Sequence, residues 1–303
     1  MYQPETSPAP QEPVSHTQPV GASRSPEERS PEQRPTEDPA EPAEPGEPYT
    51  VEHWISAQLH REALERFLPR GARVLELSTG PAQLTEVLHR LGCKLTVLAA
   101  SADELESGRA RARERGFEAG VESWGEGSMV NLEAFADASF DAIVAYGGVL
   151  GYALERRDRA LAECMRVLAP RGLLIIGVFS LWGSMHRHLP LILSRDLVDN
   201  RAVIRSGNVL GAGAEPSIDP ASAVLGGGRP CHLFRAAELE AFLRRGGLEL
   251  LSLSSASALS TGLGRPLGSD PSAWSALLEY ERAACVERGY LDSGTQLIAV
   301  ARR

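Results

Sequence analysis

The chain has 303 residues, 43% of them hydrophobic, and a formal net charge of −9, which is enough apolar material for one substantial core. Residues 1–48 hold 12 of the 21 prolines, no Phe, Trp, Ile or Leu, and 10 acidic against 3 basic residues, a net charge of −7. We expect this segment to be a disordered tail, because it cannot offset its ordering entropy by burial. The remainder, residues 49–303, is nearly neutral and is predicted to be one domain without a nucleic-acid-binding surface.

From residue 50 onward, helix-length and strand-length apolar runs alternate. This alternation predicts an α/β fold with an open, mostly parallel sheet of seven strands, an antiparallel last strand and helices on both faces. The expected helices cover residues 54–68, 82–92, 102–116, 159–168, 236–247 and 272–289, and the expected strands cover 73–77, 94–100, 121–124, 140–146, 173–180, 248–255 and 294–303.

The alternation of helix-length and strand-length runs stops between residues 181 and 231. This stretch contains one apolar helix-like piece, LPLILSRDLV, and then a glycine-rich run from GNVLGAGAEP to LGGGRP. We interpret it as a small cap inserted after the fifth strand.

The cysteines and the apolar runs limit the remaining possibilities. The four cysteines are far apart and form no C-x-x-C pair, so neither a metal site nor a disulfide framework is predicted. No apolar stretch has membrane-spanning length, and the first residues lack a basic region followed by an apolar run. We expect a soluble, cytoplasmic protein. Arginine is used almost to the exclusion of lysine, which favours a GC-rich bacterial source. The acidic tail is interpreted as a solvating linker, with a tether to a protein partner as the alternative.

Several motifs follow one another in a familiar order. They are VLELSTG at 74–80, ASFDAIVAYGGVLGY at 138–152, RVLAPRG at 166–172 and the closing run GTQLIAVARR. Together they resemble the class I S-adenosylmethionine-dependent methyltransferases of the small-molecule type, over about residues 50–303. The resemblance implies a Rossmann-like fold, S-adenosylmethionine as cofactor and a small molecule as substrate.

The resemblance also implies where the cofactor would bind, and three of those positions depart from the family's pattern. The implied positions are Glu76, Ser78, Gly80, Ala99, Gly127, Ser128, Met129, Tyr146 and Gly147. Ser78 replaces the first glycine of the family's G-x-G-x-G turn, Ala99 replaces the ribose-binding carboxylate, and Ser128 replaces the adenine-binding one. Losing a carboxylate that accepts two hydroxyl hydrogen bonds costs about 2 to 4 kcal/mol. Two functions therefore stay open: a methyltransferase with partly rebuilt cofactor contacts, or a pseudo-methyltransferase that serves in binding or interaction.

The chemistry of methyl transfer needs an aligned nucleophile, and a base only where that nucleophile must lose a proton. The candidates for a chemical role are His232, where the cap rejoins the domain, and Tyr152 in GVLGY. His186 and His188 stand in SMHRHLP beside arginine, so solvated side chains are the favoured interpretation there.

Overall fold

The computed structural model describes residues 50–78, 83–194, 200–209, 229–262 and 271–303. The predicted tail and Gly80 lie outside the described residues, and so do parts of the predicted cap. The division into tail, domain and cap therefore stays a prediction.

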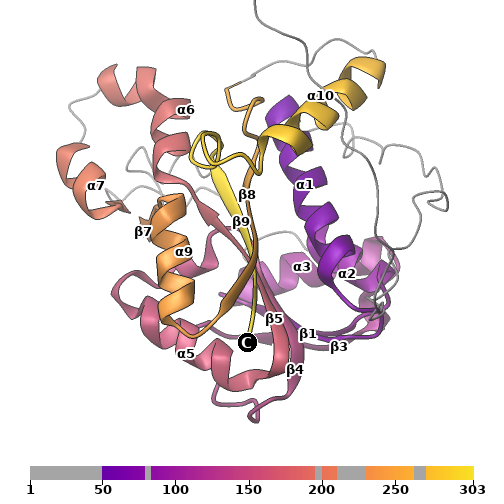
Figure 1. Ribbon diagram of the computed structural model, residues 1–303. Coiled ribbons are helices and arrows are strands. Elements are labelled where there is room, and N and C mark those ends of the chain that lie inside the picture. Colours follow the sequence, from indigo (N-terminus) through magenta and orange to yellow (C-terminus); the bar gives the residue numbers. More distant parts are fainter. Residues whose placement is uncertain (1–49, 79–82, 195–199, 210–228, 263–270) are drawn as a thin grey trace, which may run out of the picture. The chain divides into compact units, whose positions relative to one another are not determined.

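The described chain forms the predicted seven-stranded sheet, in the order β3-β2-β1-β4-β5-β9-β8 (Figure 1). The first five strands are parallel, with β1 paired to β2 in the register Arg73↔Lys94 to Ser78↔Ala99. The last strand, β9, is antiparallel to both neighbours, as predicted. The strands are β1 Arg73–Ser78, β2 Lys94–Ala99, β3 Val121–Glu126, β4 Phe140–Ala145, β5 Leu168–Phe179, β8 Glu249–Ala256 and β9 Gln296–Arg302.

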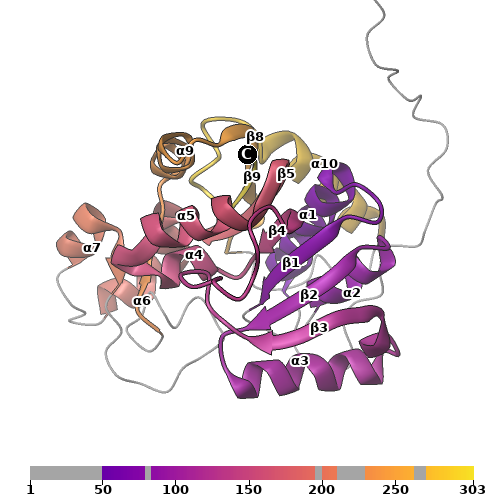
Figure 2. The same ribbon diagram turned by 90° about the horizontal axis from the view of Figure 1, so that it is seen from below.

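Helices cover both faces of the sheet, and each face has its own apolar core (Figure 2). One face packs against α4 Val149–Tyr152, α5 Arg157–Val167 and α9 Ala236–Arg245, with 3₁₀ turn η2 Leu154–Arg156 before α5. The other face packs against α1 Val51–Phe67, α2 Gln83–Arg90, α3 Ala102–Glu114 and α10 Pro271–Ala284, with η1 Glu118–Gly120 before β3. A parallel sheet buried on both sides explains why its strands read as continuous apolar runs.

Two element boundaries differ from the sequence-based expectation by five residues. Strand β5 begins at Leu168 and includes Pro170, because the register with β4 shifts there and the proline stands in the irregular part of the pairing. Helix α10 ends at Ala284 and does not reach residue 289. The Cys285 carbonyl accepts the Ser255 N–H at 2.8 Å, so it points at β8 and the helix does not continue.

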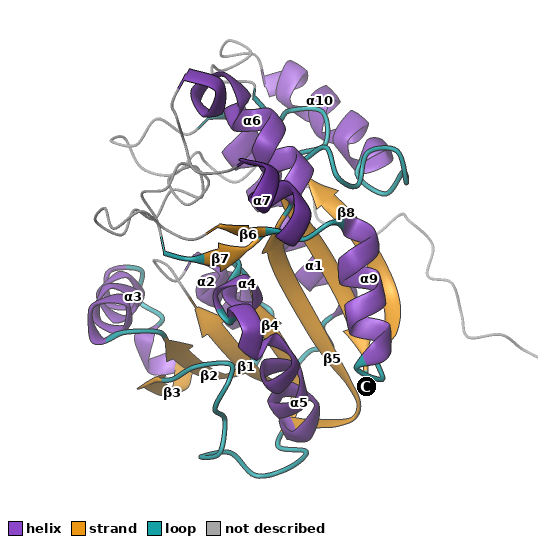
Figure 3. Ribbon diagram, turned by 90° about the vertical axis from the view of Figure 1, so that its left-hand side faces the viewer, coloured by secondary structure: helices purple, strands orange, loops and turns teal. Residues whose placement is uncertain are grey.

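The segment after β5 starts with α6 Leu181–Ser194, whose first turn is capped by Ser180 Oγ, which accepts the Gly183 N–H at 3.3 Å. Helix α7, Asn200–Ser206, leads into a two-stranded antiparallel hairpin of β6 Asn208–Val209 and β7 Cys231–His232. Figure 3 shows this hairpin between α7 and α4. A separate apolar cluster, which includes Phe179, Met185 and Leu233, holds the segment against the end of β5.

Candidate functional site

The carboxyl ends of the parallel strands β3, β2, β1 and β4 meet at one edge of the sheet. The chain runs outward from β1 to β2 and β3 and then returns to β4 on the other side of β1. Such a reversal of strand order is where open α/β sheets receive ligands, outside the carboxyl ends of the strands. The candidate site is therefore the edge formed by Ser78, Ala99, Glu126 and Ala145, the last residues of these four strands.

Glu76 is the buried acidic group of this edge. It lies in β1, two residues before the strand ends, and is 4% exposed. Burial raises the pKa of its carboxyl group to about 7, and the nearby Thr85 hydroxyl of α2 opposes the shift. Neither Glu76 Oε2 nor Thr85 Oγ1 has a hydrogen-bond partner in the described chain, although both are buried. A buried carboxylate oxygen without a partner is costly, so this one suits a ligand group that donates a hydrogen bond.

At the position where the resemblance implies ribose binding, this chain has no carboxylate. Ala99 is 3% exposed, and its carbonyl accepts the Gly127 N–H at 2.9 Å. A Cβ on Gly127 would lie 2.7 Å from Leu98 Cδ1, a contact that a shift of the leucine side chain relieves. Ser128 is exposed, with its hydroxyl 3.4 Å from the Val130 N–H.

Met129, another position that the resemblance implies, lies in the core. Its side chain is 2% exposed and belongs to the apolar core on the α5 side of the sheet. We assign it to packing.

A different carboxylate, Glu104, lies at the end of β2. Its Oε2 accepts the Ala100 N–H at 3.1 Å, one residue beyond Ala99, while Ser101 caps α3. Its Oε1 is 3.5 Å from Nη1 of Arg229, whose guanidinium lies 4.9 Å from the centre of the Tyr152 ring. Glu104 was not among the residues predicted from the sequence. The run SADE, a serine followed three residues later by a glutamate at a helix start, was the available signal.

Tyr146 and Gly147 follow β4 at the same edge. Burial raises the pKa of Tyr146 far above its ordinary value, and its hydroxyl donates to the His60 carbonyl at 3.4 Å. Gly147 and Gly148 have φ of +74° and +79°, which favours glycine at both positions. At Gly148 a Cβ would also lie 2.4 Å from the Phe179 ring.

His232 is held by protein groups on both sides of its ring. It is 1% exposed, with Nδ1 2.7 Å from Asn208 Oδ1 and Nε2 2.7 Å from Glu238 Oε1. A ring whose two nitrogens are both engaged has no atom left for substrate chemistry, and we interpret it as the residue that fastens the hairpin to α9. Of the other histidines considered, His186 is exposed and His188 is half-buried on α6.

Tyr152, the other candidate for a chemical role, lies near the edge where the parallel strands end. Its ring meets Phe179 edge-on at 6.2 Å, and burial raises the pKa of its hydroxyl to about 12. The side chain is therefore a neutral phenol at physiological pH.

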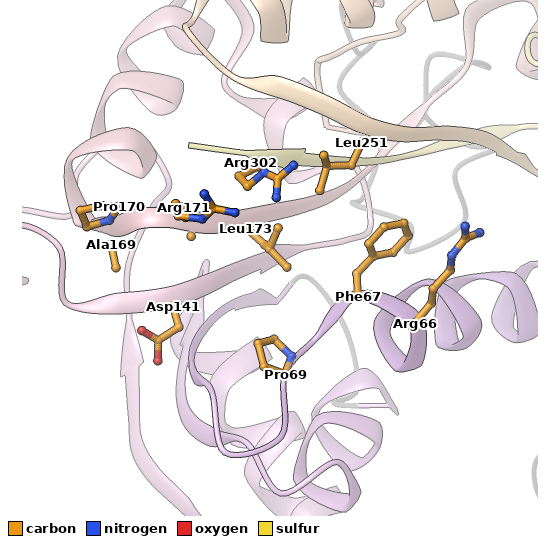
Figure 4. A pocket seen from close by; sticks show the side chains of 11 residues that line it. Arg66, Phe67, Pro69, Asp141, Ala169, Pro170, Arg171, Leu173, Leu251 and Arg302 are labelled. Atoms are coloured by element: carbon orange, nitrogen blue, oxygen red, sulfur yellow. The ribbon is translucent and has the colours of Figure 1, made fainter. Parts of the chain in front are cut away.

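A pocket of about 490 Å³ lies at the opposite edge, where β4 and β5 begin (Figure 4). Asp141, Arg171 and Arg302 line it, but the Asp141 carboxylate is already engaged by the Arg73 guanidinium at 2.7 Å. None of the lining residues is a fully buried polar group, so we do not assign this pocket a ligand. Over the described ranges, no acidic, His or Cys cluster suits a metal ion, and no helix is long and apolar enough to cross a membrane.

Comparison with known proteins shows what the domain is similar to. Residues 75–176 match the family model of a methyltransferase domain. A methyltransferase structure from Methanosarcina mazei has a TM-score of 0.51 at 18% identity, over 80% of this chain and 96% of that chain. A putative methyltransferase of Haloferax volcanii, solved in complex with the Trm112 methyltransferase activator, has a TM-score of 0.51 at 16% identity, over 83% and 89%. A putative sarcosine dimethylglycine methyltransferase from Galdieria sulphuraria has a TM-score of 0.50 at 16% identity, over 83% and 84%. Comparison with curated proteins gave no match.

The sheet order, the antiparallel β9 and the ligand edge at β1 and β4 define a Rossmann-like α/β domain. Residues 75–176 match a methyltransferase domain, and the fold is the one found in solved S-adenosylmethionine-dependent methyltransferases.

Proposed function

We propose that this chain binds S-adenosylmethionine at the carboxyl ends of β1 and β4 and transfers its methyl group to a small molecule. The observation that carries the proposal is Glu76, a buried carboxylate with an unpaired oxygen, in β1 of the segment that matches a methyltransferase domain. Bound S-adenosylmethionine would supply an electrophilic methyl group. Glu76 would accept a hydrogen bond from its ammonium group, and the turn at Gly147 would leave room for the amino-acid part.

The residues expected at the ribose of the cofactor match the family's pattern less closely. Ala99 offers no acceptor, whereas Glu104 places a carboxylate beside the next residue of the chain. In this proposal the Glu104 carboxylate would take the ribose hydroxyls.

Calorimetry with S-adenosylmethionine and S-adenosylhomocysteine tests the proposal. We expect binding by the wild type and a loss of about 10-fold to 100-fold in affinity for Glu76→Gln, since one charge-assisted hydrogen bond is worth about 1.5 to 3 kcal/mol. Glu122→Gln, an exposed change in β3, is the matched control. Absence of measurable binding to both compounds would reject the function.

The second candidate, a pseudo-methyltransferase, is favoured by the apolar and buried Ala99. If the site has simply lost its anchors, the double variant Ala99→Asp with Ser78→Gly should tighten cofactor binding by about 2 to 4 kcal/mol from a weak starting level. Tight binding by the wild type and no gain in the double variant would instead favour the enzyme.

A further inference from the structure

A polar stripe on α1 faces the carboxyl ends of β4 and β5 and the amino end of β9. Glu52, Ser56 and His60 recur at four-residue intervals and so share one face of the helix. Glu52 and His60 are 5% and 6% exposed, which makes them buried polar groups within an otherwise apolar helix–sheet contact. Buried polar groups usually have hydrogen-bond partners inside the protein.

Glu52 is fully engaged by the neighbouring elements. Its Oε2 accepts from Arg187 Nε of α6 at 2.9 Å and from the Gly262 N–H at 3.1 Å, and its Oε1 accepts from Thr295 Oγ1 at 3.1 Å. Thr295 directly precedes β9, at the edge where β5 ends. This end of the stripe connects α1 to α6 and to the start of β9.

His60, at the other end of the stripe, is paired on one side only. Its Nδ1 lies 2.7 Å from the Ser56 carbonyl, which can only accept, so Nδ1 carries the proton. Burial lowers the pKa of the ring to about 4, with the Ser56 bond opposing the shift, so the imidazole is neutral at pH 7. Its Nε2 has a free lone pair and no hydrogen-bond partner among the described residues. His232, with both nitrogens engaged, shows what a purely structural histidine looks like in the same chain.

The surroundings of Nε2 lie next to the carboxyl end of β4, the edge where we propose that the cofactor binds. The ring meets Tyr146 edge-on, with centroids 4.5 Å apart, directly after β4. Both rings lie over Gly177 of β5, where a Cβ would come within 3.1 Å of His60 Nε2 and 2.9 Å of Tyr146 Cδ1. Gly177 thus leaves the space that these two side chains need.

We propose that His60 Nε2 accepts the proton of a hydroxyl group on the methyl acceptor, which makes the chain an O-methyltransferase for an alcohol or phenol. This inference rests on the function proposed above. The acceptor oxygen uses a lone pair to form the new oxygen–carbon bond, and the carbon–sulfur bond breaks with its electron pair left on sulfur. The hydroxyl proton moves to Nε2 and later to water. An alkylated hydroxyl is strongly acidic, so a weakly basic imidazole suffices, whereas an ammonium product would need a stronger base.

The first test uses diethyl pyrocarbonate, which acylates unprotonated imidazole nitrogens that a small reagent can reach. We expect mass spectrometry to find His60 modified in the folded chain and protected by S-adenosylhomocysteine with phenol, while His232 stays unmodified. A His60 that reacts only after denaturation, in a chain that binds S-adenosylhomocysteine, would overturn this inference and leave the proposed function standing. A chain that binds no S-adenosylhomocysteine would overturn both.

The second test compares His60→Asn with the wild type. Asparagine can still donate to the Ser56 carbonyl, so it keeps the local bond and removes Nε2. With labelled S-adenosylmethionine and a panel of phenols, alcohols and amines, we expect methylation of hydroxyl compounds and a fall in kcat of about 100-fold or more in His60→Asn. The affinity for S-adenosylhomocysteine should stay within about twofold, because proton acceptance adds little to ground-state binding. His53→Asn, an exposed change on the same helix, is the control. A preference for amines, or a full rate in His60→Asn, would refute the role.

Discussion

Among single residues, Glu76 is a buried carboxyl group that lowers the stability of the folded chain and that a ligand could use as a hydrogen-bond acceptor. Its pKa is raised to about 7 by burial, against 4.5 for the free group. The folded chain therefore holds this proton more tightly than the unfolded chain does. Stability from this group is fully present below about pH 4.5 and is lost as pH rises towards 7, by about 3 kcal/mol in all. The same uncompensated oxygen is what a ligand would satisfy.

We predict that Glu76→Gln stabilises the ligand-free chain at pH 8 by about 2 to 3 kcal/mol, because glutamine stays neutral. The two proteins should have similar stability near pH 4.5. Urea unfolding at both pH values measures this difference, with Glu122→Gln as the control. Parallel stability–pH curves for Glu76→Gln and wild type would show that Glu76 is not desolvated.

The candidate site could be predicted from sequence only where a residue's position in the chain fixes its role. Glu76 and the glycines after β4 follow directly from strand-and-turn patterns. Glu104 and His60 could not be found in that way, since each is defined by a contact that the fold makes: Glu104 with the end of β2, and His60 with β4 and β5. The partners of His232 could not be found from sequence either, because Asn208 lies 24 residues away and Glu238 is on α9.

At the level of elements, strand existence and order followed from the apolar runs, whereas element ends depended on tertiary contacts. The start of β5 is decided by its irregular pairing with β4, and the end of α10 by the Cys285 carbonyl that bonds to β8. Short elements such as α4 carry too few residues for a periodic signal. Its place is set by the two left-handed glycines that precede it.

Helix α6 approaches the turn before β9 so closely that only glycine fits at residue 183. A Cβ on Gly183 would lie 1.7 Å from the Gly294 carbonyl oxygen. In an open helix the change to alanine would gain about 1 kcal/mol. Here we expect Gly183→Ala to destabilise the chain by about 3 kcal/mol, because overpacking against backbone outweighs helix propensity.

Thermal unfolding of Gly183→Ala, beside Gly289→Ala, checks this packing. No atom lies within 4 Å of a Cβ built on Gly289, so that variant should stay within about 0.5 kcal/mol of the wild type. Equal stability of the two variants would mean that α6 does not pack on the turn.

For the whole molecule, charge and hydrophobic content are divided unevenly along the chain. Residues 1–48 carry −7 of the net −9 but no Phe, Trp, Ile or Leu. The two apolar cores are built from residues between Val51 and Ala301. Within the described ranges, β9 lies between β5 and β8 and so joins the parallel part of the sheet to its outer strand.

Removal of residues 1–48 should therefore leave the melting temperature within about 2 °C of the full chain, because stability follows buried apolar area and this segment has little to bury. Removal of residues 296–303 is the contrasting deletion. It takes away β9, whose Leu297, Ala299 and Val300 are at most 1% exposed, and should abolish the cooperative transition. Calorimetric scans of the three proteins at equal concentration compare them directly. A drop of more than about 5 °C on removing residues 1–48, which at this size corresponds to more than about 1 kcal/mol, would show that the segment contributes to the folded state despite its composition.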